Sequence, residues 1–186
     1  LAKAQKPFLE KKLAEQGMFL LYAGAWPPQG IYSKKQLNSA ADMKGLKWRA
    51  YSPATARIAE LVGAQPVTIQ AAELSQAMAT GVIDSYMSSG STGYDTKTYE
   101  HIKNWYDTQA WLPKNAVIVN RAAFNALDKP TQDALLKAGA EAETRGWAAS
   151  KAENTRTVGL LKQNGMNIIP PPEQLEAHLT QVGDVM

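Results

Sequence analysis

The chain has 186 residues, of which 45% are hydrophobic and 20% are charged, a globular composition that excludes a disordered or fibrous protein. The 20 basic and 17 acidic residues leave a net charge of +3 without any block of five like charges, which gives nucleic-acid binding little electrostatic support. There is no cysteine, and the two histidines are His101 and His178, so disulfides, thiol nucleophiles and the known Cys/His zinc patterns are excluded.

The N-terminal part predicts a helix followed by a buried strand. Residues 7–16 have helical character and Gly17 is a natural stop, after which MFLLYAGAW (18–26) is an apolar run typical of a strand covered on both faces. Charges interrupt the first 17 residues, so they do not form a signal peptide. Their pattern is typical of the middle of a helix, and we expect the chain to begin inside a longer protein. Two prolines end the strand, and residues 31–42 are expected to form a polar loop.

A second α/β unit is predicted between the proline breaks at 27–28 and 113. Ser52 followed by Pro53 predicts a helix start, because serine is a favoured N-cap and proline suits the first helical position. Glycines at 63 and 81 end the helices that precede them. The expected elements are strands at 46–51, 65–70, 82–87 and 106–112, helices at 54–62, 71–80 and 95–104, and a flexible loop at 88–93.

The C-terminal part predicts one unusually long helix. Residues 115–120 are expected to form another buried strand, and Asp128 then caps a helix with Pro130 in its first turn. Helical character continues over 129–163 with three glycines as its only interruptions, well beyond the usual globular length. A short strand before the prolines at 170–172 and a helix over 173–181 complete the chain.

The sequence provides no catalytic centre. The spacing of SSGSTG (88–93) fits neither the nucleophile elbow nor the phosphate loop. We interpret the acids nearest to predicted element ends as caps and surface charges, and both histidines as surface residues. We therefore expect no catalytic residue, no metal ligand and no cofactor.

Arg49 is the residue that most favours a binding function. It stands near the end of a strand, just before the helix start at Ser52, where free N–H groups and the helix dipole attract an anion. A guanidinium can hold a carboxylate through two hydrogen bonds. The alternative from the residues alone is a surface arginine paired with Glu60 or Asp42. Among the tryptophans, Trp26 and Trp111 lie beside proline breaks and are the better candidates for a cleft.

Four segments in order resemble one family. DMKGLKWR (42–49), GAQP (63–66), ELSQAMATGVID (73–84) and KTYE (97–100), with matching gaps, are similar to the solute-binding proteins of TRAP (tripartite ATP-independent periplasmic) transporters. The likeness extends from about residue 8 to 169. It implies an α/β clamshell of two lobes with a long bracing helix, whose first lobe is incomplete because the first third of the family pattern is absent. Residues 1–26 and 114–186 would form partial lobe one, and 27–113 would form lobe two.

The resemblance also implies a periplasmic receptor, without enzymatic activity, that delivers a small organic acid to the membrane permease subunits of a TRAP transporter for ion-coupled uptake. In the family the arginine of G-L-K-x-R clamps the solute carboxylate, and Arg49 occupies that place. Sialic-acid-binding members have a second arginine where this chain has Gln29, a stacking phenylalanine near Ala71 and an asparagine at Ser88. These differences favour a monocarboxylate, with Trp26 and Ser52 as further ligand-binding residues.

Two alternative functions and one possible partner remain open at this point. The chain could be an α/β enzyme acting on a small carboxylate, although it lacks an evident base or nucleophile. It could be the ligand-sensing domain of a signalling protein, although no membrane helix is visible. A second copy of the chain is the possible partner, through the incomplete lobe, because an open apolar sheet edge can pair with another strand.

Overall fold

The computed structural model describes residues 2–186 and divides them into two compact units. Unit 1 comprises the residues up to Trp26 together with Pro113–Ala152, and unit 2 comprises Pro27–Leu112 together with Glu153–Met186. Both combine helices with a β-sheet, which confirms the predicted α/β class. None of the described helices is long and apolar enough to cross a membrane.

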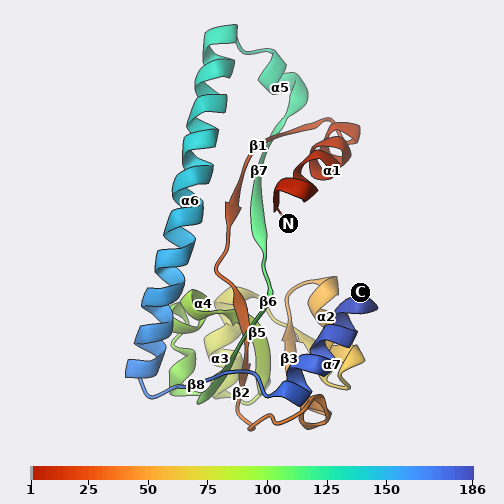
Figure 1. The fold of residues 1–186 in the computed structure, drawn as a ribbon, viewed down its shortest axis with the longest axis vertical. Coiled ribbons are helices and arrows are strands. Elements are labelled where there is room, and N and C mark those ends of the chain that lie inside the picture. Colours follow the sequence, from red (N-terminus) through yellow and green to blue (C-terminus); the bar gives the residue numbers. More distant parts are fainter. Residues whose placement is uncertain (1) are drawn as a thin grey trace. The chain divides into compact units, whose positions relative to one another are not determined.

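Unit 1 contains a two-stranded antiparallel sheet (Figure 1). Strand β1 (Met18–Ala25) pairs with β7 (Lys114–Asn120), and the other elements are helix α1 (Ala2–Glu15), helix α5 (Arg121–Asn125) and the first part of α6 (Lys129–Gln163). These two strands have no further neighbour among the described residues, which agrees with the expectation of an incomplete first lobe. The expectation that both strands are buried is wrong: Leu20 is the one buried residue of β1, and Ile118 of β7 is 43% exposed.

Unit 2 contains a six-stranded sheet in the order β4-β3-β5-β2-β6-β8. The strands are β2 (Gln29–Ser33), β3 (Lys47–Ala50), β4 (Gln65–Thr68), β5 (Ser85–Ser89), β6 (Asn104–Trp111) and β8 (Asn167–Ile169). Strand β2 is antiparallel to both β5 and β6, whereas β3, β4 and β5 run parallel. The carboxyl ends of β3, β4, β5 and β6 therefore meet the amino end of β2 at one edge of the sheet.

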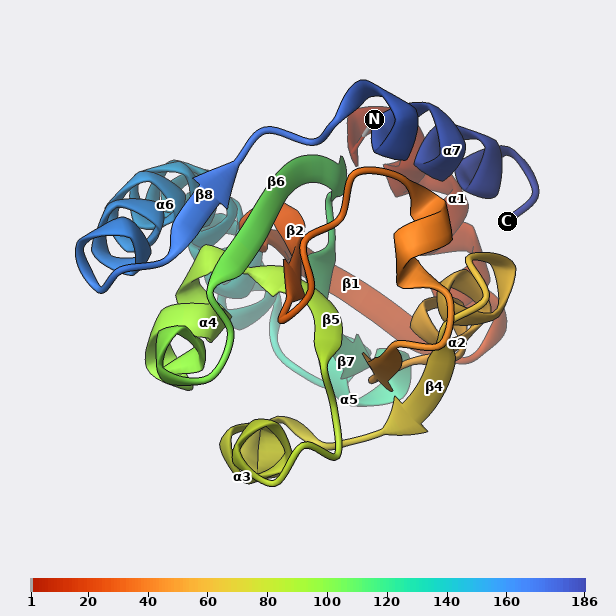
Figure 2. The ribbon, with the colours of Figure 1, turned by 90° about the horizontal axis from the view of Figure 1, so that it is seen from below.

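The helices of unit 2 cover both faces of this sheet (Figure 2). One core joins Ile31, Trp48 and Met87 to α2 (Pro53–Leu61) and α7 (Glu173–Asp184), along with the short helix η1 (Ala40–Met43). The other core joins Tyr32, Tyr86 and Trp105 to α3 (Leu74–Ala79) and to the end of α6. Adjacent residues alternate between the two cores, as the period of two in a strand requires. Two further short helices, η2 (Ala71–Glu73) and η3 (Thr98–Glu100), also belong to unit 2.

Three local predictions in unit 2 are wrong. The loop predicted at 31–42 begins inside β2, every residue of which is buried. The flexible loop predicted at 88–93 is the end of β5 followed by helix α4 (Gly90–Asp95), where the Ser89 hydroxyl caps the helix by accepting from the Thr92 backbone N–H at 3.2 Å. The helix predicted at 95–104 is reduced to η3, because Lys97 adopts a left-handed conformation with φ of 52°.

The C-terminal segment differs from the predicted division, in which 114–186 belonged to lobe one. Residues Glu153–Met186 belong to unit 2, because β8 pairs with β6 in parallel and Leu175 and Val182 of α7 are buried in its core. The predicted long helix is confirmed at both ends, since α6 runs over Lys129–Gln163 and the Asp128 carboxylate accepts from the Thr131 backbone N–H at 2.8 Å.

Candidate functional site

The candidate site lies at the edge of the unit 2 sheet where four strands end. Arg49 is the third residue of β3, flanked by Val67 of β4 and Tyr86 of β5. Three residues further on, Ser52 caps the start of α2 by accepting a hydrogen bond from the Thr55 backbone N–H at 3.2 Å. In open α/β sheets, ligands bind outside the carboxyl ends of the strands, and this edge is such a place.

Arg49 is a buried cation without a carboxylate partner among the described residues. It is 5% exposed, its Nε donates to the Ile69 carbonyl at 3.0 Å, and its guanidinium carbon lies 5.1 Å from the centre of the Tyr51 ring. Both acids named as alternative partners are engaged elsewhere: Asp42 pairs with Lys35 at 3.4 Å and Glu60 with Arg57 at 3.0 Å. The surface ion pair considered from the sequence is therefore wrong.

Burial makes this arginine receptive to an anion. Burial lowers the pKa of Arg49 from its ordinary value, which reflects the cost of holding a charge away from water. One of the five N–H donors is used by the Ile69 carbonyl, so the terminal fork of Nη1 and Nη2 is the part that can hold a carboxylate through two bonds. A carboxylate there would offset the desolvation of the cation.

Gln29 and Tyr51 belong to the same sheet edge. Gln29 is 5% exposed at the amino end of β2, and it pairs with Ser89 on one side and Trp111 on the other. The Tyr51 hydroxyl donates to Gln29 Oε1 at 2.9 Å. Because the Tyr51 ring also packs against the Arg49 guanidinium, one aromatic side chain connects two of the predicted ligand residues.

The remaining predicted site residues have different surroundings. Ser88 is 4% exposed and is paired with Gly30, next to Gln29. Ala71 is exposed in η2, two residues after the carbonyl that receives Arg49. Trp26 belongs to unit 1, is 42% exposed, and its backbone N–H donates to the Pro113 carbonyl at 3.0 Å.

Sequence reasoning missed Tyr51 as a site residue. Its signal was available, because it directly precedes the Ser52 cap and stands two positions after Arg49, a spacing that puts residues on one face of a strand. The other partner of Arg49, the Ile69 carbonyl, is a backbone group without a sequence signature.

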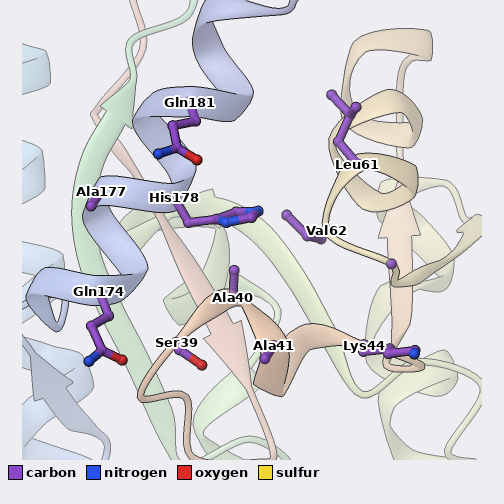
Figure 3. Close-up of a pocket in the computed structure, with 11 residues that line it drawn as sticks. Ser39, Ala40, Ala41, Lys44, Leu61, Val62, Gln174, Ala177, His178 and Gln181 are labelled. Atoms are coloured by element: carbon purple, nitrogen blue, oxygen red, sulfur yellow. The ribbon is translucent and has the colours of Figure 1, made fainter.

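The histidines lie outside this site. His178 is exposed on α7 and lines a shallow pocket with residues of η1 and the end of α2 (Figure 3). In that view its ring points toward Val62, and Lys44 lies at the far end of the pocket. His101 ends η3 and is half-buried. Among the described residues no three His, Cys, Asp or Glu side chains are grouped so that they could hold a metal ion.

Replacing Ser52 by alanine is expected to lower the free energy of unfolding of unit 2 by about 1 kcal/mol, because the Thr55 N–H loses its acceptor at the start of α2. Ser52→Thr retains a hydroxyl and serves as the matched control. Denaturant unfolding of the two variants measures the difference, and equal stability of the alanine and threonine variants would argue against the cap.

The geometry defines a class of protein: an α/β domain with a buried arginine that has no ion-pair partner in the described part of the chain, placed at the carboxyl edge of the sheet and suited to hold a carboxylate. Residues 3–185 match the family described as DctP, bacterial extracellular solute-binding protein, family 7. The chain therefore belongs to this family, whose structural neighbours are TRAP solute receptors.

Solved structures and a curated relative agree with this assignment. The chain is 68% identical to DctP6, a Bordetella pertussis extracytoplasmic solute receptor binding pyroglutamic acid, with a TM-score of 0.96 over 99% of this chain and 61% of that one. It is 40% identical to a TRAP solute-binding protein specific for pyroglutamate from an unidentified marine microbe, with a TM-score of 0.94 over 99% of this chain and 60% of that one. A solute-binding protein of Albidiferax ferrireducens is 27% identical over 87% of this chain and 48% of its own length, so the chain spans about half of that relative.

Proposed function

We propose that the protein is a periplasmic receptor that binds a small cyclic monocarboxylate of the pyroglutamate type and delivers it to the permease of a TRAP transporter. The observation that carries this proposal is Arg49, a buried cation without an ion-pair partner among the described residues. Two relatives, at 68% and 40% identity, are described as binding pyroglutamate, which is such an acid.

The chemistry of the proposed site suits one carboxylate. Arg49 supplies one cationic fork, and the N-terminus of α2 adds partial positive charge nearby. Gln29 is neutral, whereas the sialic-acid-binding members of the family have a second arginine at this position. Pyroglutamate has a single carboxylate, on a five-membered ring that also carries an amide N–H and an amide carbonyl. The ring polar groups are therefore expected to meet neutral partners such as Gln29 and Ser88.

We expect binding without turnover, since the site contains an anion anchor and hydroxyl or amide groups and the sequence offers no base or nucleophile beside them. Ala71 and Ser52 are proposed to shape the rest of the site, with smaller effects on affinity than Arg49.

Calorimetric titration of the full-length protein with L-pyroglutamate, lactate, pyruvate and succinate tests this proposal. L-Pyroglutamate is expected to bind one to one and more tightly than the other acids. Proton NMR of each acid after long incubation with the protein is expected to show no conversion. Failure of all four acids to bind would contradict the receptor function, and consumption of any of them would contradict its non-enzymatic character.

A further inference from the structure

The contact between Tyr51 and Gln29 gives the Gln29 side chain a definite orientation. The hydroxyl donates to Oε1 at 2.9 Å, and both residues belong to unit 2. Gln29 is 5% exposed, so its amide has few alternative arrangements. Among the hydrogen bonds of the described residues none uses Gln29 Nε2, which leaves the NH2 group as the donor that Gln29 can offer.

The direction of this hydrogen bond follows from its atoms. The Tyr51 hydroxyl donates to Gln29 Oε1, and an amide oxygen can only accept. The carbonyl side of Gln29, rather than its NH2 side, therefore faces Tyr51.

We infer that Tyr51 is a positioning residue that fixes Gln29 with its NH2 group available to the ligand, so that the site selects carboxylates whose ring also carries a hydrogen-bond acceptor. This inference rests on the proposed function, because it assumes that the carboxylate is held by Arg49. The stacking of the guanidinium on the Tyr51 ring, at 5.1 Å, ties the two recognition elements to one side chain.

The expected selectivity follows from the donors and acceptors. The lactam carbonyl of L-pyroglutamate can accept from Gln29 Nε2. Cyclopentanecarboxylate has a carboxylate on a ring of the same size but no ring acceptor, so it would leave that amide unpaired. A site built to hydrogen-bond a polar group discriminates strongly against an analogue that lacks it, because its own buried group is then unsatisfied.

The test compares these two ligands in calorimetric titrations of full-length wild-type protein, Tyr51→Phe, Gln29→Met and the double variant. Tyr51→Phe retains the ring against Arg49 and removes only the hydroxyl. We expect it to reduce the ratio of the L-pyroglutamate affinity to the cyclopentanecarboxylate affinity by about tenfold, which is about 1.4 kcal/mol. Gln29→Met is expected to reduce this ratio at least as much, and the double variant no further, because the hydroxyl acts through the amide. Tyr99→Phe, which removes a hydroxyl from a ring packed near Tyr94 in the same unit, is the matched control and should leave the ratio unchanged.

The outcomes separate this inference from the proposed function. Equal losses for both ligands in Tyr51→Phe would mean that the hydroxyl supports only the fold or Arg49, and would overturn the inference while the receptor function stands. An unchanged ratio in Gln29→Met, or additive losses in the double variant, would overturn it as well. If neither ligand binds to wild-type protein, the proposed function fails and the inference fails with it.

Discussion

Replacing Arg49 by alanine is expected to lower the affinity for L-pyroglutamate by more than a hundredfold. Each charge-assisted hydrogen bond from the guanidinium contributes about 1.5–3 kcal/mol, and each 1.4 kcal/mol corresponds to about a tenfold change in affinity. Arg49→Lys keeps the charge and loses the planar fork, so we expect a smaller loss of about ten- to a hundredfold. Calorimetric titration of both variants against wild-type protein measures these losses.

The structure provides a matched control for this experiment. Arg57 lies on α2, and its guanidinium makes an exposed ion pair with Glu60 at 3.0 Å. Arg57→Ala removes the same charge from the same unit and is expected to change the affinity by less than about twofold, because exposed pairs contribute little. Circular dichroism of Arg49→Ala should show a folded protein, since the side chain lies at the end of the sheet and, among the described residues, makes one hydrogen bond, to the Ile69 carbonyl. Wild-type affinity in Arg49→Ala would refute the anchor role.

The sequence predicted those elements that carry strong local signals. The helix α6 was predicted from 129 to 163 because an aspartate cap precedes it and no proline interrupts it after its first turn. Helix α2 was predicted from Ser52 and Pro53, which the structure places at the N-cap and the first helical position. In both cases the boundary is set by residues adjacent in the sequence, which is why pattern reasoning reaches it.

The elements that were missed depend on contacts distant in the sequence. Strand β2 follows two prolines and contains a glycine and a serine, yet it becomes a central strand because β5 and β6 pair on both its sides. The segment after Ser88 has the composition of a flexible loop. Its hydroxyls instead satisfy one another in a buried setting, as with Ser89 and Ser91 at 2.9 Å.

The same limit applies to the candidate site. Arg49 could be singled out from the local pattern of strand end and helix start. That Arg49 has no ion-pair partner within residues 2–186 could not be predicted, because this depends on the positions that Asp42 and Glu60 take in the fold. The contact between Gln29 and Tyr51 joins residues that are 22 positions apart, and it depends on the strand order, in which only β5 separates β2 from β3. Strand order of this kind cannot be predicted from the periodicity of any one segment.

The second large expected effect is the loss of stability on replacing Gly30, the neighbour of Gln29 in β2. Its strand pairs with β6 through an irregular register, in which Gln29 faces Trp111 and Ile31 faces Tyr106. A Cβ atom at residue 30 would lie 2.5 Å from the Trp105 indole nitrogen and would also collide with the Tyr106 backbone carbonyl. Trp105 is fully buried and the carbonyl belongs to the sheet, so neither can move aside easily.

Gly30→Ala is therefore expected to destabilise unit 2 by about 3 kcal/mol, at the upper end of the usual cost of overpacking a core. A loss of this size corresponds to a fall in melting temperature of roughly 6–12 °C for a protein of 150–250 residues.

The matched control is Gly24→Ala in β1, where no atom lies within 4 Å of the added Cβ and the change should stay within about 0.5 kcal/mol. Thermal unfolding by circular dichroism gives the two differences, and hydrogen exchange of the β2, β5 and β6 amides locates the loss. Because Gln29 is adjacent, the affinity for L-pyroglutamate should fall together with the stability in Gly30→Ala and remain at the wild-type value in Gly24→Ala. A Gly30→Ala protein as stable as wild type would mean that β2 and β6 can separate without cost, and that the sheet edge carrying Gln29 is less rigid than the selection of one ring acid requires.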